Sequence, residues 1–150
     1  MQNFKKIIVV GALIYKKSQM LACKRSQEKD QAGLWEVPGG KVEKDESHQE
    51  ALERELKEEL QISVVVQHHV ATSFVTNPIS NIHITMYVYA CQIIGSTETN
   101  DLRSTDHDEI RWIDTQDIAQ LQWAIADVPI LDDFQQFLEK QAQCWDNPLN

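Results

Sequence analysis

Three glutamates crowd one short segment of the chain, and their spacing places them on one side of a helix. Glu55, Glu58 and Glu59 fall within roughly one 100° arc, because each residue of an α-helix turns about 100°. Like charges at i, i+4 destabilise a helix, so Glu55 and Glu59 do not serve helix stability. Mg²⁺ prefers oxygen ligands and is commonly shared between carboxylates and substrate phosphates. The cluster therefore predicts a divalent-cation site that grips a diphosphate, and the alternative is a solvated acidic helix face.

Local signals define the helix that would carry these acids. Ser47 and Glu50 form the spacing of a capping box, so we expect a helix over residues 46–60. An apolar stripe at i, i+4 and i+8 would dock this helix on a core; it consists of Leu52, Leu56 and Leu60. A solvated acidic face would explain neither the Pro38-Gly39-Gly40 turn before the helix nor Arg54 among the acids.

The segment resembles the signature of the Nudix hydrolases, G-x5-E-x7-R-E-U-x-E-E-x-G-U, in which U is aliphatic. The matching positions are Gly40, Glu46, Arg54, Glu55, Leu56, Glu58, Glu59 and Ile62. One position departs, because Gln61 stands where the family has glycine. A glycine there suits a left-handed helix C-cap, and glutamine in the same conformation costs about 1 kcal/mol. Further segments over residues 21–25, 33–43 and 123–129 resemble the MutT-like members, so the resemblance covers most of residues 5–140.

Length and composition indicate one globular domain over residues 1–150, with a frayed tail over 143–150. The net charge of −9 argues against a nucleic-acid polymer as partner, and no apolar stretch reaches the roughly 18 residues of a membrane span. The cysteines are odd in number and widely spaced, which predicts reduced thiols in a cytoplasmic protein. The sequence is compatible with both a monomer and a homodimer.

Hydrophobic periodicity predicts an α+β fold. Strands are expected at about 5–15, 19–25, 33–37, 62–76, 82–94 and 108–113, and helices at 46–60, 115–121 and 128–142. Asp127 would cap the last helix, with Pro129 in its first turn. A mixed sheet with helices on both sides is expected, and it agrees with the α/β/α sandwich that the Nudix resemblance implies.

The resemblance also implies a reaction and its metal ligands. MutT-like members hydrolyse a nucleoside triphosphate to the monophosphate and pyrophosphate by attack of water on phosphorus. The implied cofactor is Mg²⁺, with Mn²⁺ as the alternative, and the implied ligands are Gly39, through its carbonyl, Glu55, Glu58, Glu59 and Asp106. Asp106 corresponds to a glutamate of the family that reaches the metals from a later loop, and its neighbours Asp108 and Glu109 are alternatives.

Catalytic roles follow from the same resemblance. Glu55, or a carboxylate of the later loop, is the candidate general base. Arg54 would orient a glutamate rather than touch substrate. Glu46 would hold the junction between loop and helix or assist the metal ligands.

The candidate substrate-binding residues are Arg25, Lys41, Asp127 and Trp35. MutT-like enzymes contact the nucleotide with an arginine at the Arg25 position, and Lys41 follows the glycines where it could meet phosphate. Asp127 stands where those enzymes read the base, and the alternative role as a helix cap is compatible with this one. Trp35 lies near the expected pocket, although tryptophans are more often core residues.

The leading hypothesis is a Mg²⁺-dependent nucleoside triphosphate pyrophosphohydrolase that sanitises the nucleotide pool, with 8-oxo-dGTP as the favoured substrate. The alternative substrate is CTP, dCTP or a modified pyrimidine. Asp127 and Ile82 favour this alternative, because Ile82 cannot donate a hydrogen bond where MutT has an arginine that helps grip the base. A non-catalytic nucleotide sensor would be expected to lose carboxylates of the signature, and all of them are present.

Overall fold

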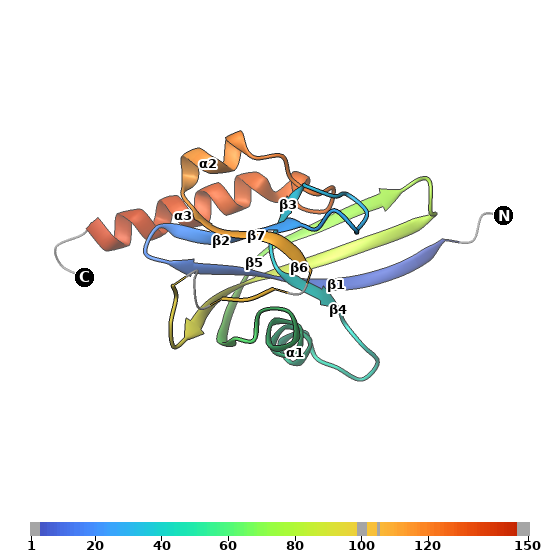
Figure 1. The fold of residues 1–150 in the computed structure, drawn as a ribbon, viewed down its shortest axis with the longest axis horizontal. Coiled ribbons are helices and arrows are strands. Elements are labelled where there is room, and N and C mark those ends of the chain that lie inside the picture. Colours follow the sequence, from blue (N-terminus) through green and yellow to red (C-terminus); the bar gives the residue numbers. More distant parts are fainter. Residues whose placement is uncertain (1–3, 99–101, 105, 147–150) are drawn as a thin grey trace.

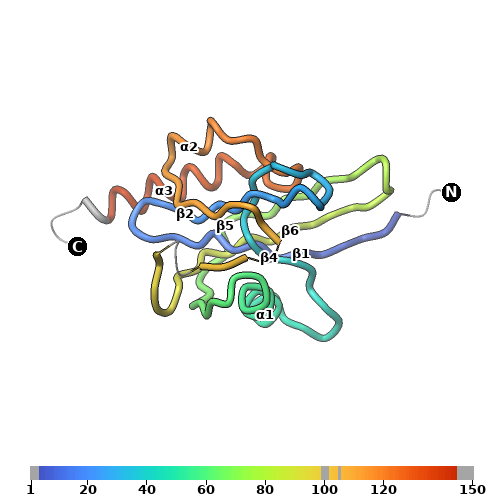
Figure 2. The backbone as a smooth tube through the Cα atoms, in the orientation of Figure 1, coloured from blue at the N-terminus to red at the C-terminus, as the bar shows by residue number. Residues whose placement is uncertain are grey.

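A twisted sheet separates one helix from two others in the computed structural model (Figures 1 and 2), which describes residues 4–98, 102–104 and 106–146. Helix α1 (His48–Leu60) covers one face of the sheet. Helices α2 (Thr115–Gln120) and α3 (Leu131–Asp146) cover the other face. The α+β fold, an α/β/α sandwich, is therefore confirmed.

The sheet is mixed, as the sequence predicts. Its strands are β1 (Lys5–Lys16), β2 (Gln19–Arg25), β3 (Trp35–Glu36), β4 (Gly39–Lys41), β5 (Ser63–Asn77), β6 (Ile82–Ile94) and β7 (His107–Ile113). The main path runs in the order β3-β2-β1-β6-β5, while β4 pairs with β1 and β7 with β2. Strands β1 and β6 are parallel, and the other pairs are antiparallel.

Alternate residues of β1 supply two separate cores, because successive side chains of a strand point to opposite faces. Val10, Ala12 and Ile14 pack in the cluster that contains the leucine stripe of α1. Leu13 packs in the other cluster, with Phe134 of α3. The central strand thereby fixes α1 and α3 on opposite sides of one sheet.

Helix α1 ends at the predicted residue, and it begins at His48 rather than at residue 46 because Ser47 is its N-cap. Ser47 Oγ accepts from the Glu50 amide at 3.0 Å, and Glu50 Oε1 accepts from the Ser47 amide at 3.1 Å, so the capping box is complete. The helix ends at Leu60, and Gln61 adopts the left-handed conformation with φ 58° and ψ 36°. The chain therefore keeps the backbone that favours glycine while carrying glutamine there.

Strand β4 was not predicted, because Pro38, Gly39 and Gly40 were interpreted only as a turn. Gly39 has a φ of 155°, and a Cβ at this residue would collide with the carbonyl oxygen of Val10 in β1. Only glycine lets the backbone approach β1 so closely, and the resulting ladder pairs Gly39 with Gly11 and Gly40 with Val10. This pairing brings the diglycine over the acidic helix.

The prediction of the last helix needs correction at both of its ends. A 3₁₀ turn over Val128–Ile130 precedes α3, and Asp127 makes no side-chain capping bond to it. Helix α3 extends to Asp146, beyond its predicted end at residue 142. The frayed tail over 143–150 stays a prediction, and residues 147–150 lie outside the described part. The expected loop over 95–105 includes residues 99–101 and 105, which are also outside it. Within the described residues, no helix is both long and apolar enough to cross a membrane.

Replacing Gln61 by glycine should stabilise the protein. A left-handed φ strains any residue with a Cβ, and relieving this strain raises the free energy of unfolding by about 1 kcal/mol. Urea denaturation of Gln61→Gly measures the gain. Gln116→Gly, at an exposed position inside α2, is the matched control and should lower the free energy of unfolding. An equal loss in both variants would contradict the assignment of strain to Gln61.

Candidate active site

Arg54 pairs with several acids of α1 and of the loop before it. Its Nε lies 2.6 Å from Glu46 Oε2, and its Nη1 lies 2.9 Å from Glu55 Oε1 and 3.4 Å from Glu58 Oε2. Its Nη2 donates to the carbonyl of Lys41 at 3.0 Å. The guanidinium therefore ties β4, the following loop and the helix together, which is the geometry of a residue that orients carboxylates.

Glu46 closes the loop between β4 and α1. Both of its oxygens accept from Arg54, and Oε1 also accepts from the Glu43 amide at 2.9 Å. Hydrogen bonding from Arg54, followed by that from the Glu43 backbone, lowers the pKa of Glu46 to about 2. The structure thus places Glu46 at the junction of loop and helix, and the role in assisting the metal ligands stays a prediction.

The diglycine of β4 lies directly against the carboxylates of α1. A Cβ at Gly40 would overlap the carboxyl group of Glu55, so only glycine leaves room for this side chain. A hydrogen bond from the Gly39 backbone reaches Glu59. The signature glycine and two signature glutamates therefore meet in space because β4 packs on the helix.

Glu59 is a largely buried acid whose negative charge is disfavoured by its surroundings. Its Oε2 is buried and has no hydrogen-bond partner. Burial, followed by the charges of Asp106, Glu55 and Glu36, raises the pKa of Glu59 to about 8. A buried acceptor without a partner among other carboxylates suits a divalent cation, which would satisfy the oxygen and offset the repulsion.

Asp106 is the later-loop acid that meets this cluster. A side-chain hydrogen bond joins it to Glu59, and Lys29 Nζ lies 3.1 Å from its Oδ1. Although partial burial opposes ionisation, the hydrogen bond from Lys29 lowers the pKa of Asp106. Asp108 and Glu109, the alternatives to Asp106, are placed differently on β7. Asp108 is exposed, and Glu109 Oε2 lies 2.7 Å from Arg111 Nη2.

The predicted ligand set is only partly assembled. Gly39, Glu55, Glu59 and Asp106 come together, whereas the side chain of Glu58 is 62% exposed and turned to Arg54. Among the described residues, no three acidic, histidine or cysteine side chains converge closely enough to hold a cation in this conformation. Mutual repulsion of the carboxylates and the pairing of Glu58 with Arg54 explain this spread.

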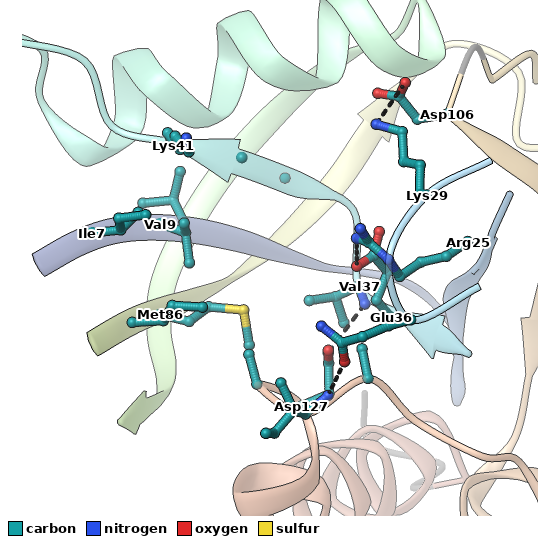
Figure 3. Close-up of a pocket in the computed structure, with 18 of the residues that line it drawn as sticks. Ile7, Val9, Arg25, Lys29, Glu36, Val37, Lys41, Met86, Asp106 and Asp127 are labelled. Carbon is teal, nitrogen blue, oxygen red and sulfur yellow. Dashed lines mark hydrogen bonds and ion pairs between the residues drawn. The ribbon is translucent and has the colours of Figure 1, made fainter. Parts of the chain in front are cut away.

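A pocket of about 290 Å³ leads from these acids across the sheet (Figure 3). Its charged end is lined by Arg25, Lys29, Glu36, Gly39, Gly40, Glu59 and Asp106, while Lys41 lies beside Ile7 and Val9. Its other end is lined mainly by apolar residues, Ile7, Val9, Ile84, Met86, Ala124 and Ala126, with Asp127 among them. One end suits phosphates and cations, and the other suits a flat, mostly apolar group with one polar edge.

Asp127 is a buried acid rather than a helix cap. It is 2% exposed, and its Oδ1 accepts from the Val37 amide at 3.1 Å. Burial, followed by the charge of Glu36, raises the pKa of Asp127 well above its usual range. Asp127 therefore places one polar group among the apolar residues that line the pocket.

The remaining predicted substrate residues divide into two groups. Lys41 and Arg25 line the pocket, although Arg25 is already held by Asp30 at 2.6 Å and by Glu36 at 2.9 Å. Trp35 does not line it, and this is a correction. Its ring is 5% exposed in the core, and Arg111 lies 4.8 Å from the ring centre, so no open face is left for a base.

Three charged or polar residues near the site were missed by the sequence reasoning: Lys29, Glu36 and His107. Glu36 lies in the segment over 33–43 that resembles the family, and His107 is the neighbour of Asp106, so both lie beside residues that the sequence singles out. Nothing in their spacing connects them, because the contact between Glu36 and His107 joins residues that are 71 positions apart.

The fold and the site together define the class of protein: an acidic helix beneath a diglycine strand, facing a pocket for a phosphorylated ligand. The chain belongs to the NUDIX family, whose domain model matches residues 5–134, and it is a Nudix hydrolase. It is 37% identical to the CTP pyrophosphohydrolase of Escherichia coli over 130 residues, which cover 87% of this chain and 92% of that protein.

Two further relatives support the same family. A putative 8-oxo-dGTP diphosphatase of Mycobacterium tuberculosis is 31% identical over 81% of this chain and 82% of its own length. The solution structure of the Escherichia coli ORF135 protein matches with a TM-score of 0.75 and 36% identity, over 89% of this chain and 91% of that one.

Removing the charge of Glu59 should flatten the pH dependence of stability in the metal-free protein. The folded protein holds this proton more tightly than the unfolded chain, so the free energy of unfolding falls as pH rises from about 4.5 to about 8. Glu59→Gln lacks this contribution. Urea denaturation in EDTA at pH 5 and pH 8 measures the difference.

Glu58→Gln is the matched control, because Glu58 lies on the same helix and is largely exposed. Its stability should follow the wild-type pH dependence. A Glu59→Gln profile as steep as that of the wild type would contradict the burial of a protonated Glu59.

Proposed function

We propose that this Nudix hydrolase is a nucleoside triphosphate pyrophosphohydrolase that prefers a cytosine-type base and releases the monophosphate and pyrophosphate. The observation that carries the proposal is Asp127, a buried carboxyl at the apolar end of the pocket. A carboxyl oxygen can accept from the exocyclic amine of cytosine, and the O–H of a protonated carboxyl can donate to the ring N3. The identity with the CTP pyrophosphohydrolase of Escherichia coli over 87% of the chain supports this choice.

The pocket suggests one orientation for the nucleotide. The triphosphate would lie at the charged end, where Arg25 and Lys29 carry positive charge and Glu59 and Asp106 offer oxygen ligands. The base would then lie among the apolar side chains near Asp127. The opposite orientation would bury the phosphates beside Asp127, away from the carboxylates that would hold a compensating cation.

The residues that would hold the divalent cation, Mg²⁺ or alternatively Mn²⁺, are Gly39, Glu55, Glu58, Glu59 and Asp106. When bound, such an ion neutralises phosphate oxygens and lowers the pKa of a coordinated water. Arg54 and Glu46 keep the carboxylates of α1 in place against β4. Glu55, beside Gly40, is the candidate general base, and Asp106 is the alternative.

An 8-oxoguanine nucleotide is the second candidate substrate. The relative in Mycobacterium tuberculosis favours it, and a neutral Asp127 could also donate to a purine. Ile82, which was expected near the base, is not among the residues that line the pocket. Over most of the chain, the identity with the CTP pyrophosphohydrolase, 37%, exceeds the 31% with the relative in Mycobacterium tuberculosis, and this supports the pyrimidine alternative over the 8-oxo-dGTP hypothesis.

A substrate comparison tests the proposal. Pyrophosphate release with Mg²⁺ is measured as kcat/KM for CTP, dCTP, 5-methyl-dCTP, dGTP and 8-oxo-dGTP. We expect a cytosine nucleotide to exceed both purines by about tenfold or more, because a site that hydrogen-bonds a base discriminates against one that leaves its polar groups unpaired. A preference for 8-oxo-dGTP would instead assign the second candidate.

The catalytic assignment is tested with Glu55→Gln, which should lower kcat by at least roughly 100-fold. Glu53→Gln is the matched control, because Glu53 lies on the exposed side of α1 and should leave kcat unchanged. Full activity of Glu55→Gln would refute the mechanism. Nucleotide binding by the wild type without any hydrolysis would assign a sensor instead.

Asp127→Asn tests how the base is recognised. The amide keeps an acceptor for the Val37 amide, but it cannot offer the acidic proton or the charge of a carboxyl. We expect kcat/KM for CTP to fall by about tenfold or more, while the rate with inorganic triphosphate, which lacks a base, stays at the wild-type value. Equal losses for both substrates would contradict a role for Asp127 in base recognition.

A further inference from the structure

His107 is buried at the start of β7, and polar groups engage both of its ring nitrogens. Its side chain is 1% exposed. Nε2 lies 2.8 Å from Glu36 Oε2, and Nδ1 lies 2.7 Å from Ser104 Oγ. A neutral imidazole that donates from Nε2 and accepts at Nδ1 satisfies both contacts, because a carboxylate accepts and a hydroxyl can donate.

The same hydroxyl fixes the backbone of Asp106. The Asp106 amide donates to Ser104 Oγ at 3.2 Å, and the Asp106 carbonyl accepts from the Ser26 amide at 3.3 Å. The backbone N–H and C=O of Asp106 are therefore both hydrogen-bonded. The acceptor for the N–H, Ser104 Oγ, is also the group that contacts His107. The side chain of Asp106 is left pointing to Lys29 and Glu59.

Glu36 links this arrangement to the other side of the pocket. Its Oε2 accepts from His107, while its Oε1 accepts from Arg25 Nη1 at 2.9 Å. A register shift between Lys24 and Arg25 in the ladder of β2 and β7 places Arg25 opposite His107. The irregularity thereby aims two side chains from different strands at one carboxylate, as bulges beside functional sites commonly do.

We propose that His107 is a positioning residue for the cation site, acting through Ser104 on Asp106 and anchored by Glu36. Glu36, His107 and Ser104 form a latch that holds Asp106 opposite Glu59. The inference rests on the proposed function in one respect only, namely that Asp106 belongs to the residues that hold the divalent cation. His107 itself does not line the pocket and is not assigned any contact with substrate.

The latch predicts an effect on cation binding that needs no nucleotide. Mn²⁺ binding to the wild type, His107→Ala and His107→Gln is measured by the paramagnetic resonance signal of free Mn²⁺. His107→Ala should bind Mn²⁺ about tenfold more weakly, because groups that orient metal ligands typically contribute that much. His107→Gln, whose amide can donate to Glu36 and accept from Ser104, should recover affinity to within about threefold of the wild type.

Kinetics supply a second readout. With CTP and limiting Mg²⁺, His107→Ala should lower kcat while KM for the nucleotide changes by less than about twofold, because the base and Arg25 contacts persist. His68→Ala is the matched control, since His68 is exposed on β5 away from the pocket. It should equal the wild type in both measurements.

Three results would overturn the latch: Mn²⁺ affinity of His107→Ala within about twofold of the wild type, a change confined to KM, or no recovery in His107→Gln. If circular dichroism shows that His107→Ala is unfolded, Ser104→Ala, which removes only a hydroxyl, is tested in its place. It should then weaken Mn²⁺ binding in the same direction. Wild-type protein that binds Mn²⁺ but hydrolyses none of the nucleotides would refute the proposed function and leave the latch to be decided by Mn²⁺ binding alone.

Discussion

The guanidinium of Arg54 is shared by carboxylates that would otherwise repel one another. It reaches Glu46, Glu55 and Glu58, and it lies 3.8 Å from Glu43. Without this shared cation, the loop after β4 and the first turns of α1 would carry unbalanced negative charge at close range. The same guanidinium bonds the carbonyl of Lys41, so one side chain fixes both the charge balance and the position of the diglycine strand over the helix.

The negative charge of Glu59 is not balanced by Arg54. Arg54 does not reach it, and it is buried beside Asp106 with one oxygen unpaired. The protein therefore keeps one acidic position incompletely satisfied at the end of a pocket whose opposite end is apolar. Such stored electrostatic stress is characteristic of sites whose ligand completes them. The helix stripe and the two cores on either side of β1 supply the stability that tolerates it.

Interactions of two kinds build the site, and they differ in how far they reach along the chain. Arg54, Glu46 and the capping box connect residues within a short segment. Glu36 and His107, Asp127 and Val37, and Gly39 and Gly11 connect strands and loops from distant parts of the chain. The first kind places the carboxylates on one helix, and the second decides which of them faces the pocket and what stands opposite.

The sequence by itself determined the parts whose causes are local. The spacing of Ser47, Glu50 and the leucine stripe sufficed for the bounds and orientation of α1, and the signature spacing sufficed for the family. Only the tertiary structure decided that Asp106 rather than Asp108 meets Glu59, and that Trp35 is buried. Such choices depend on strand register and on packing across the whole chain, and residue type and spacing do not encode these in any short window.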